Sequence, residues 1–374
     1  MDSVDSILLN LMKCNTFLYC NNRSCYDNCA SIISNLFSEL GFQIDLIDTS
    51  VGKIIIGKHI IDTQYSHVHF NGHYDVVPPA NNARIGYQEK ESTFWGRGCS
   101  DMKGGIVAVW IACKNAIEQK ISINLSFSFS PDEETGGIVA SKKIPANLLE
   151  FLPKNSMIII ADSSYPNIIT SHRGALWVEI AITLDSKKRF EKKAISAFEI
   201  MCHYYLDFMK TCSNSDIVIG GNCQTSNAVN VWAHTAVFSL DYRFDAPLTL
   251  NEQEKWTQNH LNELNKKMQS EFSFDFNPLL WKILLAVEPC TTIGDFDNVL
   301  HIARKTIPEA NLEKGKGFYD LRYFRNEGYK NSFVLGPGDI FYAHVKEEKL
   351  KKDNILDCAK VYLGLIERIK YDNF

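Results

Sequence analysis

The chain has 374 residues, of which 45% are hydrophobic and 22% charged, and its formal net charge is -5 at pH 7. This composition is typical of an ordered globular protein, and the length favours two packed domains. The balance of 44 acidic against 39 basic residues predicts no binding surface for nucleic acid or for an anionic membrane, so we expect a small-molecule partner.

The first residues and the cysteine content indicate the compartment. Asp2 and Asp5 stand where a signal peptide needs basic residues, and no stretch reaches the roughly 20 apolar residues of a membrane span. The chain has 11 cysteines, an odd number that is typical of reduced thiols. We therefore expect a cytoplasmic protein without disulfides.

Short β-rich runs alternate with a helical pattern in the first half of the chain. The runs are KIIIGKHII (53–61), SHVHFNG (66–72), ISINLSFSF (121–129) and SMIIIAD (156–162), and the apolar spacing of residues 103–117 predicts a crossover helix. This alternation predicts an α/β fold in which helices cover a sheet.

The pattern changes near residue 176. Residues 175–184 predict a strand and 194–210 a helix, while NAVNVWA (227–233) and HTAVFSLDYRF (234–244) predict a hairpin, followed by a polar helix over 251–269. The strand NSFVLG (331–336) then resumes the first pattern. We predict a domain formed by residues 1–176 and 285–374, interrupted by an α+β insert over 177–284.

Residues that bind metal ions follow several of the predicted strands, where open α/β sheets place their sites. His73 and Asp75 follow the second run; His73 could ligate a metal while Asp75 orients its ring. Asp101 lies in a Gly-rich loop ahead of the predicted helix, where it could bridge two cations or cap the helix.

Further acids and a histidine complete the set. Glu133 and Glu134 follow the third run, where adjacent carboxylates are costly unless a cation holds them. Asp162 ends the fourth run and His344 follows the last strand; either alone is more often a surface or capping residue. Imidazole and carboxylate ligands suit Zn²⁺, and Co²⁺ or Mn²⁺ could also bind them.

Four motifs resemble a known family. GHYDVVPP, WGRGCSDMKGG, SPDEETGG and AHVKEE are similar to motifs of the dinuclear-zinc peptidases and deacylases, which include succinyl-diaminopimelate desuccinylase, acetylornithine deacetylase, aminoacylase, carboxypeptidase G and several dipeptidases. The resemblance extends over about residues 5–370. It implies a mixed-sheet zinc-peptidase catalytic domain with an inserted α+β lid that mediates homodimerisation.

The resemblance also implies roles for the predicted site residues. Two zinc ions would be held by five ligands: His73 and Asp162 on one ion, Glu134 and His344 on the other, and Asp101 between them. Glu133 would be the general base that takes a proton from water and passes it to the departing amine.

Substrate contacts are implied at four further positions: Asn230, Arg243, Asp320 and Arg322. Arg243 suits a bidentate contact with a carboxylate, although an arginine on an alternating strand is equally consistent with a surface or an ion-pair role.

The chain departs from the family pattern in the lid. The family histidine that reaches the oxyanion is missing from the segment LDSKKRFEKKAI (184–195), and His203 and His234 are the nearest candidates to replace it. A second departure is Asp162, where the deacylases usually have Glu and the dipeptidases more often Asp.

The sequence leaves three functions open. The first is hydrolysis of an N-acyl amino acid, as in the deacetylases and desuccinylases, and the second is hydrolysis of a dipeptide or short peptide. The third is a binding or regulatory role in a protein that keeps the metals but has lost the lid histidine; a preserved general base argues against it.

Overall fold

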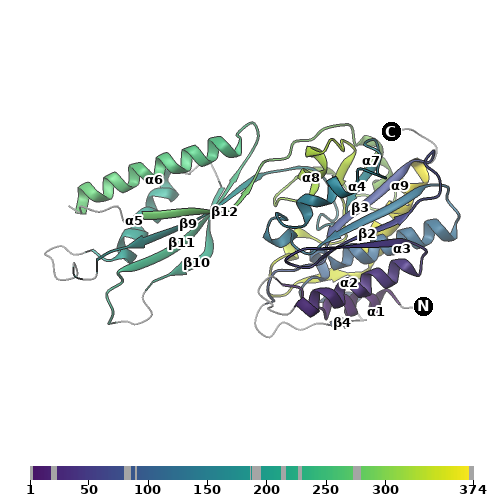
Figure 1. The fold of residues 1–374 in the computed structure, drawn as a ribbon, viewed down its shortest axis with the longest axis horizontal. Coiled ribbons are helices and arrows are strands. Elements are labelled where there is room, and N and C mark those ends of the chain that lie inside the picture. Colours follow the sequence, from purple (N-terminus) through teal and green to yellow (C-terminus); the bar gives the residue numbers. More distant parts are fainter. Residues whose placement is uncertain are drawn as a thin grey trace. The chain divides into compact units, whose positions relative to one another are not determined.

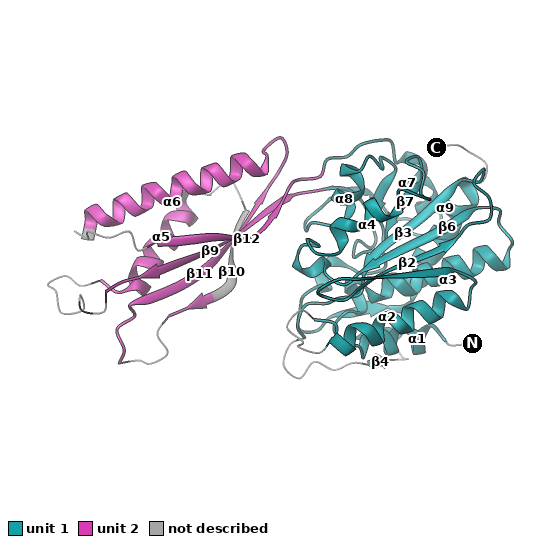
Figure 2. Cartoon of the chain, in the orientation of Figure 1, with its two compact units in different colours: residues 1–171, 291–374 teal, residues 172–290 magenta. Residues whose placement is uncertain are grey.

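The computed structural model describes residues 3–17, 23–79, 86–88, 91–185, 187, 195–211, 216–225, 230–272 and 279–369. The chain divides into two compact units (Figure 2), Met1–Ser171 with Thr291–Phe374 as unit 1 and His172–Cys290 as unit 2. The predicted ends of the insert, 177 and 284, fall inside two strands of unit 2, β9 (Gly174–Thr183) and β12 (Leu279–Val287).

The main sheet of unit 1 is mixed (Figure 1). β3 runs parallel to β6 and β7, and β7 runs parallel to β14, whereas β2 is antiparallel to both β1 and β6. The mixed α/β fold predicted from the sequence is confirmed. The order across the sheet is β1 (Gln43–Asp48), β2 (Lys53–His59), β6 (Asn124–Ser130), β3 (His67–His73), β7 (Met157–Ile160), β14 (Ser332–Val334), β8 (Ile168–His172) and β13 (Leu312–Gly315).

A second, smaller sheet of unit 1 joins segments that are far apart in the sequence. Its strands β4 (Gly86–Gln88), β5 (Thr93–Trp95) and β15 (Lys349–Lys351) are antiparallel, with β5 in the middle. The helices of unit 1 are α1 (Val4–Met12), α2 (Arg23–Ser38), α3 (Gly104–Glu118), α4 (Ile144–Leu148), α7 (Asp297–Arg304), α8 (Leu321–Asn326) and α9 (Lys352–Ile369).

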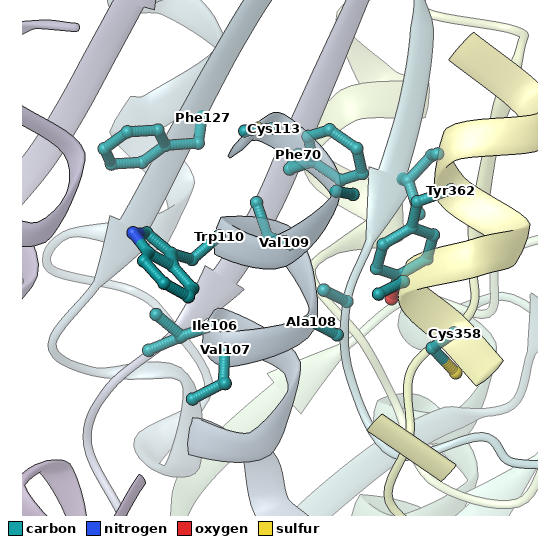
Figure 3. Packing of buried hydrophobic residues seen from close by; sticks show 14 of the residues in the cluster. Phe70, Ile106, Val107, Ala108, Val109, Trp110, Cys113, Phe127, Cys358 and Tyr362 are labelled. Carbon is teal, nitrogen blue, oxygen red and sulfur yellow. The ribbon is translucent and has the colours of Figure 1, made fainter. Parts of the chain in front are cut away.

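The predicted crossover helix over 103–117 corresponds to α3, and most of its residues are buried. Figure 3 shows Phe70 of β3 between side chains of α3 and of α9, and its ring centroid lies 5.2 Å from that of Tyr362. Gly105, the second residue of this helix, lies against the end of β7: a Cβ there would lie 1.9 Å from the carbonyl oxygen of Ala161. A glycine is therefore required where α3 approaches the end of β7.

The opposite face of β3 is polar although it is buried. Alternate residues of a strand point to the same face, and here they are His67, His69, Asn71 and His73. Ser126 Oγ lies 2.7 Å from ring nitrogens of both His67 and His69. A second serine, Ser128, continues these hydrogen bonds from His69 to Asn71, two residues before His73.

Unit 2 is an antiparallel sheet with two helices, as expected for an α+β insert. Its strand order is β10 (Asp216–Gln224), β11 (Thr235–Phe244), β9 and β12, and its helices are α5 (Ala197–Thr211) and α6 (Leu250–Phe272). The predicted hairpin partner of β11 is wrong: the described part of that segment, residues 230–233, forms no strand, and β11 pairs with β9 and β10. Strand pairing depends on distant neighbours as well as on local propensity.

Within the described ranges, none of the helices combines the length and the apolar character needed to cross a membrane.

Candidate metal centre

The predicted ligands gather at one edge of the main sheet. β6, β3 and β7 are neighbours and run parallel, so their carboxyl ends meet at this edge. His73 ends β3, Glu133 and Glu134 follow β6, and Asp162 follows β7. The structure thus brings together residues that are up to about 90 positions apart through strand order, a general property of open α/β sheets.

The ring of His73 is buried and held from one side. Its Nδ1 lies 3.1 Å from the carbonyl oxygen of Asp75 and 3.4 Å from the Oδ1 of that residue. Its Nε2 lies 3.1 Å from Asp101 Oδ1 and 3.8 Å from Asp162 Oδ1, yet none of the described residues gives Nε2 a partner with hydrogen-bond geometry. With a proton on Nδ1 alone, the ring would present the lone pair of Nε2 to the carboxylates, as a metal-binding histidine does.

Asp101 lies between two histidines. Its Oδ1 faces His73 and its Oδ2 lies 3.3 Å from Nε2 of His344. The alternative role as a helix cap is not observed, because Lys103 is the N-cap residue of α3 and Gly98 that of the short helical segment Cys99–Lys103. A carboxylate whose two oxygens face two different imidazole rings is suited to bridge two cations.

Glu134 completes the second side of the cluster. Its Oε2 lies 2.8 Å from Nε2 of His344, and its Oε1 accepts a hydrogen bond of 3.3 Å from the backbone N–H of Val77. One ligand atom from each of His73, Asp101 and Glu134 can be chosen so that all three lie within 4.8 Å of one another, a spacing that a single metal ion can span.

The carboxylates hold positive charge on the histidines. Burial alone would lower the pKa of His344, but Asp101 and Glu134 raise that pKa to about 11. Burial would likewise raise the pKa of Asp101, yet the imidazole rings of His344 and His73 beside its two oxygens lower it well below its ordinary value. The carboxylates of the cluster thus favour positive charge next to them. A bound cation can supply this charge in place of the protons on the two histidines.

Glu133 differs from its neighbour Glu134 because, in the described part of the chain, no histidine lies at hydrogen-bond distance from it. Its side chain is buried, Oε1 has no hydrogen-bond partner among these residues, and Oε2 lies 4.0 Å from Nε2 of His73. Burial raises the pKa of Glu133 well above its ordinary value, and the charges of Asp320 and Asp162 add to this effect. A nearby cation would favour the ionised form and oppose that rise.

Two further acids hold the loop that carries Glu133 and Glu134. Asp75 accepts hydrogen bonds of 3.2 and 3.1 Å from the backbone N–H groups of these two residues. Asp132 accepts hydrogen bonds of 2.8 to 2.9 Å from three consecutive backbone N–H groups, those of residues 139–141. Asp75 therefore both orients His73 and fixes the glutamates, a second role that the sequence reading missed.

The predicted substrate contacts are in varied surroundings. Asn230 lies in an exposed turn of unit 2, and Arg243 forms two hydrogen bonds, of 2.7 and 2.9 Å, with Asp241. Arg322 donates to the carbonyl oxygens of Tyr319 and Gly136. Asp320 is buried, neither of its oxygens has a hydrogen-bond partner within the described ranges, and burial raises its pKa to about 7.

The candidates for the missing lid histidine are both exposed. His203 lies on α5 and His234 immediately precedes β11. The segment in which the family histidine was expected, 184–195, lies largely outside the described residues.

One buried ion pair next to the cluster, between Arg97 and Glu348, was not predicted from the sequence. Glu348 belongs to the motif AHVKEE, but nothing in the sequence separates it from the adjacent Glu347. Only its burial, at 1% exposure, identifies it.

Together, the mixed sheet and the buried cluster of histidines and carboxylates at its edge are those of a metal-dependent hydrolase. The family model described as Peptidase family M20/M25/M40 matches residues 69–368. The chain belongs to this family, and it is a hydrolase that acts on amide bonds.

Relatives and solved structures agree with this membership. The chain is 35% identical over 325 residues to a succinyl-diaminopimelate desuccinylase of Helicobacter pylori strain HPAG1, covering 80% of each chain. A desuccinylase of Blochmanniella floridana is 32% identical over 151 residues, which cover 38% of this chain and 39% of the relative.

The structural neighbours show the same fold. A tripeptidase of Staphylococcus aureus has a TM-score of 0.75 at 17% identity, with 98% of both chains covered. A dinuclear metal-binding peptidase of the M20 family from Bacillus subtilis has a TM-score of 0.60 at 11% identity, with 98% of this chain and 99% of that chain covered.

Proposed function

We propose that this hydrolase cleaves the amide bond of an N-acyl amino acid, releasing a carboxylic acid such as succinate or acetate. The observation that carries the proposal is the buried carboxyl of Glu133. Its Oε1 has no hydrogen-bond partner among the described residues, and its Oε2 lies 4.0 Å from Nε2 of His73, which also faces Asp101. The names of the desuccinylase relatives support the class of substrate.

Two Zn²⁺ ions fit the residues of the cluster. His73 Nε2 is buried and has no hydrogen-bond partner in the part of the chain that the structure describes, and the ligand atoms are imidazole nitrogens and carboxylate oxygens, which Zn²⁺ accepts. Co²⁺ and Mn²⁺ accept the same donors. We assign His73 and Asp162 to one ion, Glu134 and His344 to the other, and Asp101 to both.

When bound, the ions would polarise the amide carbonyl and lower the pKa of a water molecule. Glu133 then accepts the proton of the attacking water and delivers it to the departing nitrogen. Glu134 cannot share this task, because its Oε2 is engaged with His344 and its Oε1 with the N–H of Val77. Asp75 keeps Glu133 in place through the backbone.

The substrate contacts belong to the same proposal. Asn230 and Arg243 would bind polar groups of the substrate, and Arg243 would exchange Asp241 for a substrate carboxylate. Asp320 and Arg322 would act close to Glu133, whose pKa responds to the charge of Asp320.

A second candidate is hydrolysis of dipeptides or short peptides. Asp162 favours it, since the resemblance associates Asp at this position with peptidases. The tripeptidase among the structural neighbours shares the fold. Cleavage of N-succinyl and N-acetyl amino acids against dipeptides such as Gly-Leu separates the two, because a free amino group should help only a peptidase.

The test uses protein saturated with Zn²⁺ and a panel of both substrate types, with release of amine as the measurement. We expect cleavage of N-acyl amino acids that is lost on chelation and restored by Zn²⁺. Faster cleavage of Gly-Leu than of N-acetyl-leucine would replace the first candidate with the second. No cleavage of any compound would leave the third reading, a metal-binding or regulatory protein.

We also propose that the protein is a cytoplasmic homodimer formed through unit 2. β12 is an edge strand of the unit 2 sheet, and it exposes Leu280 at 70% and Leu284 at 46%. Exposed apolar residues on an unpaired edge favour contact with another chain.

A further inference from the structure

His344 is the most exposed of the proposed metal ligands. Its side chain is 54% exposed. Its backbone has φ of +59°, in the left-handed region that is unfavourable for residues other than glycine. A ligand on an exposed loop in this conformation needs contacts outside the loop to fix its position.

A buried ion pair provides such contacts. Glu348, four residues after His344, is 1% exposed, and its Oε2 accepts a hydrogen bond of 2.6 Å from Nη1 of Arg97. The Nη2 of Arg97 donates to the carbonyl oxygen of Val345 at 3.3 Å. Arg97 therefore holds the loop at the residue next to His344 and again at Glu348.

The same carboxylate also holds the segment of the bridging ligand. Glu348 Oε1 accepts hydrogen bonds from the backbone N–H groups of Ser100, at 2.9 Å, and Asp101, at 3.1 Å. Both oxygens of Glu348 thus have N–H donors. This carboxylate is occupied by the chain itself and is not a further metal ligand.

The small sheet explains how these distant residues meet. β5 and β15 are antiparallel, with Trp95 opposite Lys349, and the N–H of Gly96 donates to the carbonyl oxygen of Glu348 at 2.9 Å. After Arg97 the chain turns at Gly98, whose φ is +85° and where a Cβ would lie 2.8 Å from Val76 Cγ1. The turn directs the chain into Ser100 and Asp101.

We propose that Arg97 and Glu348 are positioning residues that fix the backbone of Asp101 against the loop of His344. The pair thereby sets the spacing between the bridging ligand and the last ligand. This inference rests on the metal centre proposed above. The alternative is an ion pair that stabilises the fold and has no particular effect on the centre.

Three variants test the pair: Glu348→Gln, Arg97→Gln and the double variant. The measurements are Zn²⁺ affinity by competition with a chelator and the absorption spectrum of the Co²⁺-loaded protein. We expect each single variant to bind Zn²⁺ about 10 to 100 times more weakly, as is typical when a partner behind metal ligands is lost. The double variant should recover part of the affinity, since two amide side chains can hydrogen-bond to each other.

Leu365→Ala is the control for a general loss of stability. Leu365 is fully buried in α9, and its truncation destabilises the same unit without touching the pair. We expect this variant to unfold at a lower temperature but to bind Zn²⁺ like the wild type. Wild-type affinity in both single variants, or an equal loss in Leu365→Ala, would overturn the proposal.

Hydrogen exchange of the metal-free protein separates the pair from the metal centre. The amides of residues 96–103 and 343–348 should exchange faster in both single variants, with little change elsewhere in unit 1. If the wild type binds no Zn²⁺, the proposed function fails. The positioning role of Arg97 and Glu348 is tested even then. Faster exchange confined to these two segments supports that role, and unchanged exchange refutes it.

Discussion

Glu133 and Glu134 are adjacent in the chain but have different surroundings. The Oε2 of Glu134 lies 2.8 Å from His344, whereas Oε1 of Glu133 is buried without a partner. A general base needs an oxygen that is free to accept a proton from water, so this contrast favours Glu133 over Glu134 as the proposed base.

Glu133→Gln should lower kcat by about 10² to 10⁴ fold, because the amide cannot accept the proton of the attacking water. Zinc content, measured by elemental analysis, should stay at the wild-type level, since Glu133 is not a proposed ligand. The exposed Glu150 offers a matched control, and Glu150→Gln should keep full activity. A Glu133→Gln variant that remains fully active would remove the proposed mechanism.

The buried imidazole of His67 makes the stability of the fold depend on pH. Burial lowers the pKa of its imidazole to about 3, compared with about 6.5 in an unfolded chain. Between these two values the unfolded state binds a proton that the folded state does not bind. The contribution of His67 therefore lowers the free energy of unfolding as pH falls below about 6.5.

His67→Gln should weaken this acid sensitivity. At pH 5 the wild type should have lost about 2 kcal/mol relative to pH 7 through this residue, and the variant should not show that loss. Urea unfolding at the two pH values measures the difference. The same pH dependence in both proteins would show that His67 is protonated without cost in the folded state.

At the scale of elements, the loop after β6 matters most, since it carries both glutamates. Asp132 organises this loop by accepting the N–H groups of residues 139–141 and the hydroxyl of Ser141. Its carboxylate is buried at 1% exposure. Asp132 thus stabilises the loop, whereas its neighbours Glu133 and Glu134 belong to the proposed metal centre.

Asp132→Ala should destabilise unit 1 by about 2 kcal/mol or more, because buried N–H groups lose their acceptor. It should also weaken Zn²⁺ binding, since Glu134 is carried by the same loop. Asp62→Ala removes an acceptor of one exposed N–H, that of Gln64, and should change stability by less than about 1 kcal/mol. Equal effects of the two substitutions, in thermal unfolding and in zinc affinity, would contradict this role.

At the scale of the whole molecule, the proposed dimer depends on β12. The double substitution Leu280→Asp with Leu284→Asp places two charges on the exposed edge strand, where they would be desolvated in an interface. We expect a dimer for the wild type and a monomer for the variant in sedimentation or light-scattering measurements. Ile61→Asp, at a position 51% exposed in unit 1, should leave the dimer intact. A monomeric wild type would refute the proposal.

Much of unit 1 could be predicted from the sequence. Apolar runs and helical spacing are local signals, so the strands β2, β3, β6 and β7 and the helix α3 were found close to their observed bounds. The positions of His73, Asp101 and Asp162 at the ends of strands or ahead of a helix followed from the same local reading. The motifs around these residues indicated the protein family.

The structure alone determined the partners of these residues. The pairing of β11, the occupied carboxylate of Glu348 and the shared position of Asp101 between two histidines depend on segments that meet only after folding. A sequence pattern reports the periodicity of one segment, because the local geometry of a helix or a strand sets that periodicity. Which carboxylate is held and which oxygen stays unpartnered is decided by burial and by contacts over more than 200 residues, such as that between Glu134 and His344.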